Sequence, residues 1–501
     1  MSNYSSQSTL APAEHQKDYR QGQIIKFDVP SFYGYIDPRQ TFLRMNIELI
    51  SKARGRLSKD LGAQSLIHAI RIYDHSNAQL LENIENYGEL VKVLNVYGEN
   101  ESIKHQLQLL EAQDVETANG ELDIAESLFF KAYASSGSET EDLIALNLAC
   151  PLKVQTAMKI HSGILGGSKV FPVNAFGGLR IEIELNRAIK SFMLAKEGSS
   201  AANPLLLGVA IGGGAVIEMT VDVPLEECPF MVGQELNVVN DAAATKTITI
   251  TGLSHVEAGS MTKITFASQT LGAAAIGKSV HLSEAFRTIV ADNLDFKLSN
   301  VELCLKQVNP PATYVSDMMK QIGSEEGLNL DIKTYDLVRN NIQAGQLINE
   351  QPIRTFSERS YAIMSLIIPN DSPTLLTDDF DTLTTSKLKK YSYAIDGKKN
   401  PNRDVNTELT TTNTHFISQQ ATFELQKTLE SCGLVVRSLP VKSSFLIGRA
   451  LGRYGGVFNL SEKNLTLRTE FNTNTESLMC LNYLCSLRRL NVSNKGITVI
   501  P

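Results

Sequence analysis

The sequence predicts a mainly β protein built from two tandem antiparallel β-sandwiches or jelly rolls, with helices in the connections. Runs that alternate apolar and polar residues recur in both halves of the chain, and helical spacing is confined to a few connections. A chain of 501 residues is also too long for one ordinary core, so more than one domain is expected. The pattern is that of sandwiches and not of alternating βα units.

The first sandwich is predicted over residues 21–312, after a polar, Ser-rich tail at 1–20 that we expect to be flexible. Its strands are expected where the alternation is clearest, at 23–30, 41–50, 65–73, 143–148, 178–185 and 301–308. Apolar residues from Asn77 to Val96 fall at helical spacing and predict a helix. Shorter helical stretches are expected at 101–112 and 126–134, and an exposed acidic loop at 113–141.

Residues 205–283 differ in composition from the rest of the first half. They are rich in Gly, Ala, Thr and Val, poor in charge, and contain short strand-like runs such as 245–251 and 261–267. We interpret them as a small all-β insertion in the first sandwich.

The second sandwich is predicted over residues 313–501. Pro310 and Pro311 end the preceding strand, and residues 314–322 predict a linking helix. A second helix is expected at 415–430, with Gly433 just after its end. Strands are expected at 328–335, 361–368, 391–395, 444–450, 465–471, 478–487 and 496–500.

Composition excludes several classes of protein. The formal net charge of −7 argues against a protein that coats nucleic acid, and the charges of the 1–20 tail cancel, which argues against a genome-binding arm. The longest apolar stretch, 204–217, is too short to span a bilayer, so no transmembrane segment is expected. The N-terminus lacks the apolar core of a signal peptide.

The six cysteines are scattered through the chain, at Cys150, Cys228, Cys304, Cys432, Cys480 and Cys485. None forms a CxxC pair or a Cys/His cluster with zinc spacing. We expect buried, reduced thiols, which suits a chain assembled in the cytoplasm or nucleus.

One motif could bind a nucleotide. Residues 272–279, Gly-Ala-Ala-Ala-Ile-Gly-Lys-Ser, match the GxxxxGK[ST] pattern of P-loops, in which Gly272, Gly277, Lys278 and Ser279 would hold phosphate and magnesium. The context does not fit, because the preceding residues 263–271 are polar where a P-loop requires a buried parallel strand. We therefore interpret the string as a Gly/Ala-rich turn and expect no cofactor-binding site.

No other residues suggest catalysis or a metal site. The eight histidines form no HxH or HExxH pattern, and Asp378, Asp379 and Asp381 lack calcium-loop spacing. No serine or cysteine occupies a nucleophile elbow. The sequence therefore predicts a protein that is not an enzyme, with no catalytic residue and no metal ligand.

Several segments, in matching order, resemble the double jelly-roll major capsid proteins of polinton-like viruses, virophages and related double-stranded DNA viruses. They cover most of the chain outside the tail and the insertion: 25–38 with the 42–49 strand, 65–73 with 80–90, 163–166 with 171–173 and 177–185, 359–366, and 393–401. The insertion and the P-loop-like string have no counterpart in the family pattern.

The resemblance implies a structural protein of a virion capsid. Such chains form homotrimers with a pseudo-hexagonal footprint that tile an icosahedral shell. It also implies contacts with neighbouring capsomers, penton and minor capsid proteins, no sequence-specific binding of nucleic acid, and assembly in the host cytoplasm or nucleus. On this basis we expect residues 77–142 and 205–283 to form outward loops and the 1–20 tail to face the interior.

Two other functions stay open from the sequence. A P-loop protein such as a packaging ATPase would use the string at 272–279. A non-viral β-sandwich interaction protein would be a monomer, usually secreted and disulfide-bonded, which the scattered cysteines do not favour.

Overall fold

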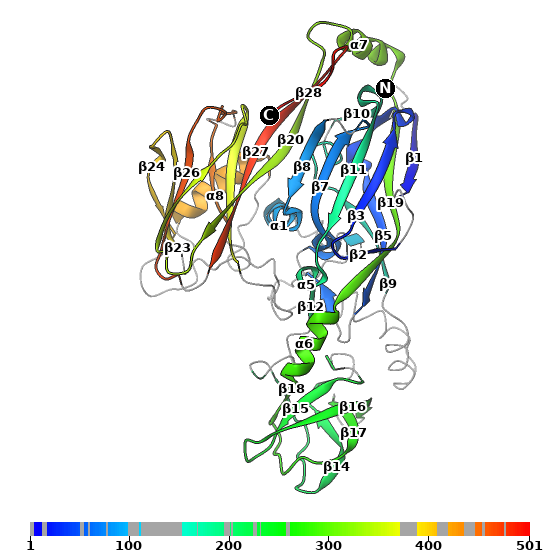
Figure 1. The fold of residues 1–501 in the computed structure, drawn as a ribbon, viewed down its shortest axis with the longest axis vertical. Helices are drawn as coiled ribbons and strands as arrows, with labels where there is room; N and C mark the ends of the chain where they lie inside the picture. The colour runs from blue at the N-terminus through cyan, green and yellow to red at the C-terminus, as the bar shows by residue number, and fades with distance from the viewer. Residues whose placement is uncertain are drawn as a thin grey trace.

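The protein forms two β-sandwiches and a smaller β domain, as the computed structural model in Figure 1 shows. The structure describes residues 5–12, 18–50, 55–58, 61–76, 79–98, 110–111, 153–167, 169–194, 201, 204–223, 228–230, 232–256, 261–370, 388–407, 419–434, 446–452, 456–474 and 477–501. The expected strands, helices and loop at 101–148 lie almost entirely outside these residues, as do Cys150 and the three aspartates near residue 380.

The first sandwich consists of two sheets. One sheet has the order β10-β4-β19-β5-β9. In this sheet, β1 and β2 pair with the edge of β19 that lies opposite to β5. The second sheet has the order β3-β11-β7-β8. The bounds are β1 Ser5–Pro12, β2 Tyr19–Arg20, β3 Ile24–Pro30, β4 Tyr35–Ile36, β5 Phe42–Ile50, β7 Ile67–Asp74, β8 Leu80–Glu85, β9 Lys153–Lys159, β10 Phe171–Pro172, β11 Gly178–Leu185 and β19 Asp295–Asn309. A separate pair is formed by β6 Gly55–Leu57 and β12 Phe192–Leu194.

The second sandwich repeats this arrangement. Its sheets have the orders β20-β27-β22-β25 and β21-β26-β23-β24, with β28 beside β27. The bounds are β20 Leu328–Ile342, β21 Ile348–Ile353, β22 Ser360–Pro369, β23 Leu388–Ile395, β24 Lys398–Asn406, β25 Leu446–Ala450, β26 Leu465–Phe471, β27 Leu478–Ser493 and β28 Gly496–Ile500. Helix α7, Ala312–Ile322, links the two sandwiches.

Both sandwiches have jelly-roll topology. In the second, with β28 left out of the count, the first strand β20 pairs with the eighth strand β27, the eighth with the third and the third with the sixth. The other sheet joins the second, seventh, fourth and fifth strands. The first sandwich has the same order when β1 and β2 are counted as one interrupted strand and the short strands β4, β6, β10 and β12 are left out of the count. The predicted fold class, two tandem jelly rolls, is confirmed.

The expected all-β insertion is also confirmed, and it closes on itself. Its sheet has the order β13-β18-β15-β16-β17-β14, and a bridge between Leu207 and Val221 joins the two ends. The bounds are β13 Leu205–Leu206, β14 Ala215–Val221, β15 Glu235–Val239, β16 Thr245–Val256, β17 Met261–Thr270 and β18 Ser279–Leu282. Helix α6, Glu284–Asn293, leads from this small barrel to β19 (Figure 1).

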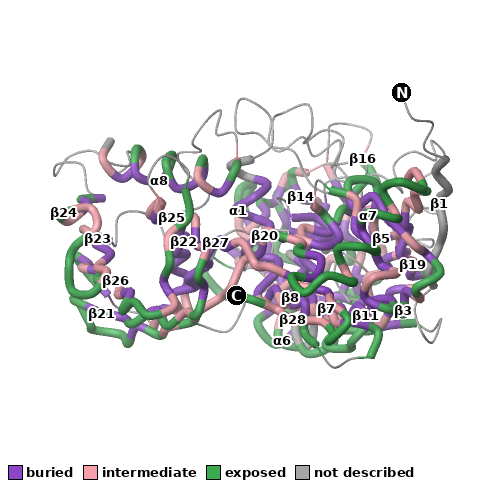
Figure 2. Tube along the Cα trace, turned by 90° about the horizontal axis from the view of Figure 1, so that it is seen from above, coloured by how far each residue is buried: buried purple, intermediate pink, exposed green. Residues whose placement is uncertain are grey.

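The sheet of the second sandwich that contains β22 is buried on both faces. Ile363 and Ile367 belong to the apolar core of the second sandwich, whereas Met364 and Leu366, from alternate positions of the same strand, belong to a cluster shared with the first sandwich. Figure 2 shows the second barrel beside the first, with buried positions on the strands that face it. The two barrels therefore pack through an apolar contact.

The expectation of a flexible tail at 1–20 is wrong for its described residues. Residues 5–12 pair with 302–309 of β19 in continuous antiparallel register, and Tyr19 and Arg20 pair with Leu298 and Lys297. The sequence concealed this strand because a polar edge strand lacks the apolar alternation on which the prediction relied.

The helix expected over 77–96 is also partly wrong. Residues 80–85 form β8, and only Tyr87–Gly98 form helix α1. A bulge opposite Ile72 and Tyr73 inserts one extra residue into β8, which shifts the buried Leu81 and Ile84 to a spacing of three that imitates a helix. Because β8 lies in a sheet and α1 is largely buried, these residues are not the outward loop that we expected.

Candidate functional site

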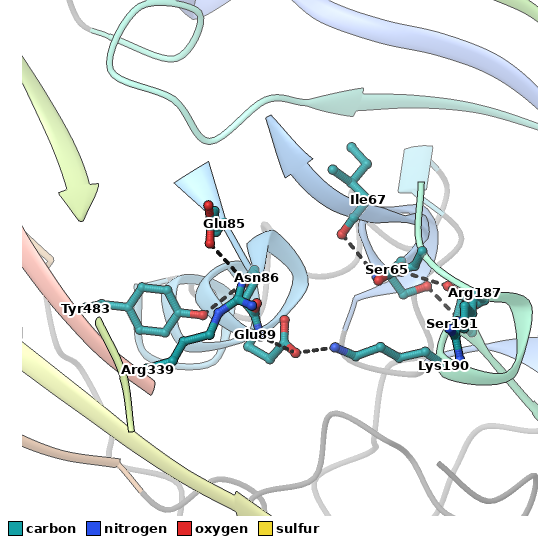
Figure 3. Close-up of polar contacts among 11 residues, drawn as sticks. Ser65, Ile67, Glu85, Asn86, Glu89, Arg187, Lys190, Ser191, Arg339 and Tyr483 are labelled. Atoms are coloured by element: carbon teal, nitrogen blue, oxygen red, sulfur yellow. Dashed lines mark hydrogen bonds and ion pairs between the residues drawn. The ribbon is translucent and has the colours of Figure 1, made fainter. Parts of the chain in front are cut away.

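The junction between the barrels is a polar site that joins distant parts of the chain. Strand β8 of the first barrel lies against β20 of the second (Figure 1), and the residue before helix α1 is hydrogen-bonded to β27. Figure 3 shows the polar side chains that meet there. We describe this site first because a structural protein acts through the relative position of its parts.

A buried hydrogen bond at the start of α1 joins the two barrels. Asn86 has a positive φ of 48°, which asparagine tolerates better than most residues, and this turn separates β8 from α1. The Tyr483 hydroxyl of β27 donates to the Asn86 carbonyl oxygen at 2.9 Å (Figure 3). Burial raises the pKa of Tyr483 well above its ordinary value, so the phenol stays protonated and keeps donating.

A buried ion pair holds α1 to the first barrel. Glu89 of α1 accepts a hydrogen bond from the Lys190 ammonium of helix α5, Ala188–Ser191 (Figure 3). Burial alone would raise the pKa of Glu89, but the Lys190 charge and hydrogen bond outweigh it and hold that pKa below its usual value. The Ser191 hydroxyl in turn donates to the Ser65 carbonyl oxygen at 2.8 Å, which fixes α5.

A second buried carboxylate supports the loop that touches the second barrel. Glu82 of β8 accepts hydrogen bonds from the Ser162 hydroxyl at 2.5 Å and from the backbone amide of Gly163 at 2.7 Å. Burial raises the pKa of Glu82. A side chain at Gly163 would overlap the carbonyl oxygen of Lys333 in β20, so only glycine allows the two backbones to come this close.

Two arginines of the second barrel complete the junction. Arg488 donates to the Leu81 carbonyl oxygen at 3.2 Å and to Asp336 Oδ1 at 2.6 Å. Arg339 pairs with Glu85 at 2.8 Å in a more exposed position at the rim. The junction therefore has an apolar centre, buried hydrogen bonds and a polar rim. Together these contacts hold the two barrels at a fixed angle to each other.

The P-loop-like residues lie elsewhere, in the insertion. Gly272 and Gly277 have positive φ and lie in the turn between β17 and β18, and Ser279 begins β18, an antiparallel strand. The amides of Ala274, Ala275 and Gly277 donate to Ile211, Asp241 and Leu207 of the same chain. Lys278 lies 3.5 Å from Asp241. This arrangement differs from a phosphate cradle, in which the amides point at the ligand.

Other candidate chemistry is sparse in the described part of the chain. No group of three His, Cys, Asp or Glu side chains there could hold a metal ion, and no helix there is long and apolar enough to cross a bilayer. The five described cysteines, Cys228, Cys304, Cys432, Cys480 and Cys485, are buried.

Sequence reasoning missed the junction. The runs at 361–368 and 478–485, each apolar except for one residue, were a usable signal, because strands buried on both faces lose the alternation of a half-exposed strand. Nothing in the sequence links Asn86 to Tyr483, which lie almost 400 residues apart.

Comparisons with known proteins agree with this fold. No protein-family model and no curated protein matches the chain. The Faustovirus major capsid protein is similar in structure with a TM-score of 0.55 at 9% identity, over 98% of this chain and 91% of that chain. A Sputnik virophage structure gives a TM-score of 0.48 at 11% identity over 99% and 88%, and PBCV-1 VP54 gives 0.48 at 10% over 100% and 97%. The chain shares the fold of the Faustovirus capsid protein.

Proposed function

We propose that this chain is the major capsid protein of an icosahedral double-stranded DNA virus and that it acts as a homotrimer. The observation that carries the proposal is the pair of jelly rolls fixed side by side through an apolar junction. Three copies of such a pair present six similar barrels, which is the shape that a pseudo-hexagonal tile requires. The likeness to the Faustovirus capsid protein supports it.

The proposal assigns the chain a structural role with no catalytic activity. It places the protein in the virion capsid after assembly in the host cytoplasm or nucleus, in contact with neighbouring capsomers, penton and minor capsid proteins. Residues 21–312 and 313–501 are the two barrel units, to which the strand at 5–12 is added. The insertion, at the end of the molecule opposite α7, is the outward tower (Figure 1).

Neither alternative is favoured. A packaging ATPase would need the amides near Gly277 for phosphate, and these donate within the chain. A binding assay with magnesium ATP tests this alternative: an increase in melting temperature that disappears in Lys278→Ala would support it. A monomeric β-sandwich interaction protein would not need two barrels locked by buried contacts.

Light scattering during size-exclusion chromatography tests the proposal. We expect a stable particle of three chains of 55.0 kDa each that survives dilution. A monomer that persists at high protein concentration would contradict the capsomer.

A further inference from the structure

We propose that the tip of the insertion is a self-association surface, through which the insertions of neighbouring copies in the trimer contact one another. This inference rests on the proposed function, because it assumes the trimer. It assigns a contact to a segment for which the resemblance to capsid proteins offers no counterpart.

Strand directions identify the tip. Strand β18 ends at Leu282, next to α6, so its beginning at Ser279 is the end away from the two large barrels. Three loops meet at this far end, namely 208–214, 240–244 and 271–278, and we call them the tip loops. Strand β14 lies at the lower end of Figure 1, away from α6, in agreement with this direction.

The tip loops form one ordered surface. Ile211 and Ala274 exchange two backbone hydrogen bonds at 2.8 and 3.0 Å, and the Asp241 amide donates to the Ala273 carbonyl oxygen at 2.9 Å. The buried Asn240 side chain donates to the Leu271 carbonyl oxygen at 3.1 Å. A surface fixed in this way loses little conformational entropy when it binds.

The tip is apolar and neutral. Ile276 is 68% exposed, and Ile217, at the start of β14, is 56% exposed. Asp241 and Lys278 are the two charged residues of the tip loops, and they pair with each other at 3.5 Å. Identical tips can therefore approach without repulsion between like charges.

The shape also favours a second copy. A hollow lies beside the tip, lined by 209–212 and 215–220. Ile276 is exposed on a different loop and does not line the hollow. In a ring of three, each hollow can receive part of the neighbouring copy while the three Ile276 side chains lie close together around the threefold axis.

A lipid surface fits the tip less well. Segments that bind the membrane interface are enriched in Trp, Phe, Lys and Arg, and the tip loops contain no aromatic residue and one lysine, which is paired. We therefore assign the tip to a second copy of this chain and treat lipid binding as an outcome of the test.

Disulfide cross-linking of the full-length trimer tests the contact. We compare Ile276→Cys, at the tip, with His255→Cys, an exposed position near the opposite end of the same small barrel, and with the unsubstituted chain as background. After mild oxidation, Ile276→Cys should give a linked pair of chains on a non-reducing gel. Three chains with one introduced cysteine each can form one disulfide, which links two of the three chains. Up to about two thirds of the chains can therefore be linked. The control should stay at background.

Light scattering of the same samples separates the two proposals. If both variants are trimers and Ile276→Cys links no more than His255→Cys, the tip contact is wrong and the capsomer stands. Particles larger than a trimer in light scattering after oxidation would place the contact between trimers and overturn the inference. Flotation of the protein with phosphatidylcholine vesicles that is lost in Ile276→Lys would assign the tip to lipid and also overturn it. If no sample is a trimer, both proposals fall.

Discussion

The two barrels share one strand order but differ in how their seventh and eighth strands are connected. In the second barrel, β26 ends at Phe471 and β27 begins at Leu478, so the connection is short in sequence. In the first barrel, β11 ends at Leu185 and β19 begins at Asp295, and the intervening chain builds the closed insertion. The jelly-roll order therefore survives a large insertion at a strand connection, because loop closure costs little extra free energy as a loop lengthens.

The helix that follows the fifth strand can also be compared between the two barrels. Helix α1 in the first barrel and α8, Gln419–Ser431, in the second occupy the same place in the strand order. Each carries a buried glutamate paired with a cation, Glu89 with Lys190 and Glu424 with Arg449. The pairs differ in burial, because the Glu89 side chain is 3% exposed and the Glu424 side chain is 10% exposed. The first barrel should therefore depend more on its ion pair.

Removal of the glutamates should show this difference most strongly. We expect Glu89→Ala to lower the free energy of unfolding by about 3–5 kcal/mol, because it removes one partner of a deeply buried ion pair. Glu424→Ala should cost less, about 1–3 kcal/mol, since Glu424 is less deeply buried than Glu89 and Arg449 keeps its hydrogen bond to Asn400. Chemical denaturation of both variants measures the difference, and equal losses would contradict the comparison.

Acid should weaken the first ion pair in a defined direction. The folded pKa of Glu89 lies below its ordinary value of 4.5, so the pair stabilises the fold above that pH and the stabilisation is lost as the pH falls through the folded pKa. Burial raises the pKa of Glu82, so protonation of Glu82 on acidification favours the folded state and opposes the loss of stability from Glu89. The measurement is therefore the difference in melting temperature between the unsubstituted protein and Glu89→Gln. It should shrink on acidification, and a constant difference would count against the pair.

Gly163→Ala should separate the barrels slightly. The added methyl group would overlap the Lys333 carbonyl oxygen, and relief of that overlap should cost about 1–3 kcal/mol. Gly212→Ala, which adds a methyl group in open space, is the matched control. Equal melting temperatures for the two variants would show that the close approach at Gly163 is unimportant.

Two tyrosines allow the junction to be compared with the interior of the second barrel. Tyr483→Phe removes the bond to Asn86, and Tyr393→Phe removes a bond to the Ser365 hydroxyl within the second barrel. Each should cost about 1–2 kcal/mol. Only Tyr483→Phe should broaden or split the calorimetric unfolding transition, because of these two hydrogen bonds only the one to Asn86 couples the barrels. The same change in both profiles would argue against that coupling.

The exposed pair at the rim should matter least. Arg339→Ala should cost under about 1 kcal/mol, and the loss should diminish at high salt because Arg339 and Glu85 are well exposed to solvent. A larger loss that salt does not change would place this pair among the buried contacts.

The sequence predicted strands best where one face is buried. The segments 178–185 and 465–471 alternate without interruption, and β11 and β26 have those same bounds. It failed where another effect changed the pattern, at the polar edge strand 5–12 and at the bulge in β8. The individual contacts of the junction could not be predicted, because the partners of Asn86 and Gly163 lie in the second barrel and no local pattern encodes those contacts.

The pairing of β1 with β19 also has a consequence for synthesis. Residues 5–12 leave the ribosome well before residues 302–309, with which they pair, so the first barrel cannot be completed until β19 has been synthesised. Contacts of such long sequence separation slow folding. Until β19 emerges, the nascent N-terminal half lacks the strand that joins β1 to β5, and chaperone protection should matter most in that interval.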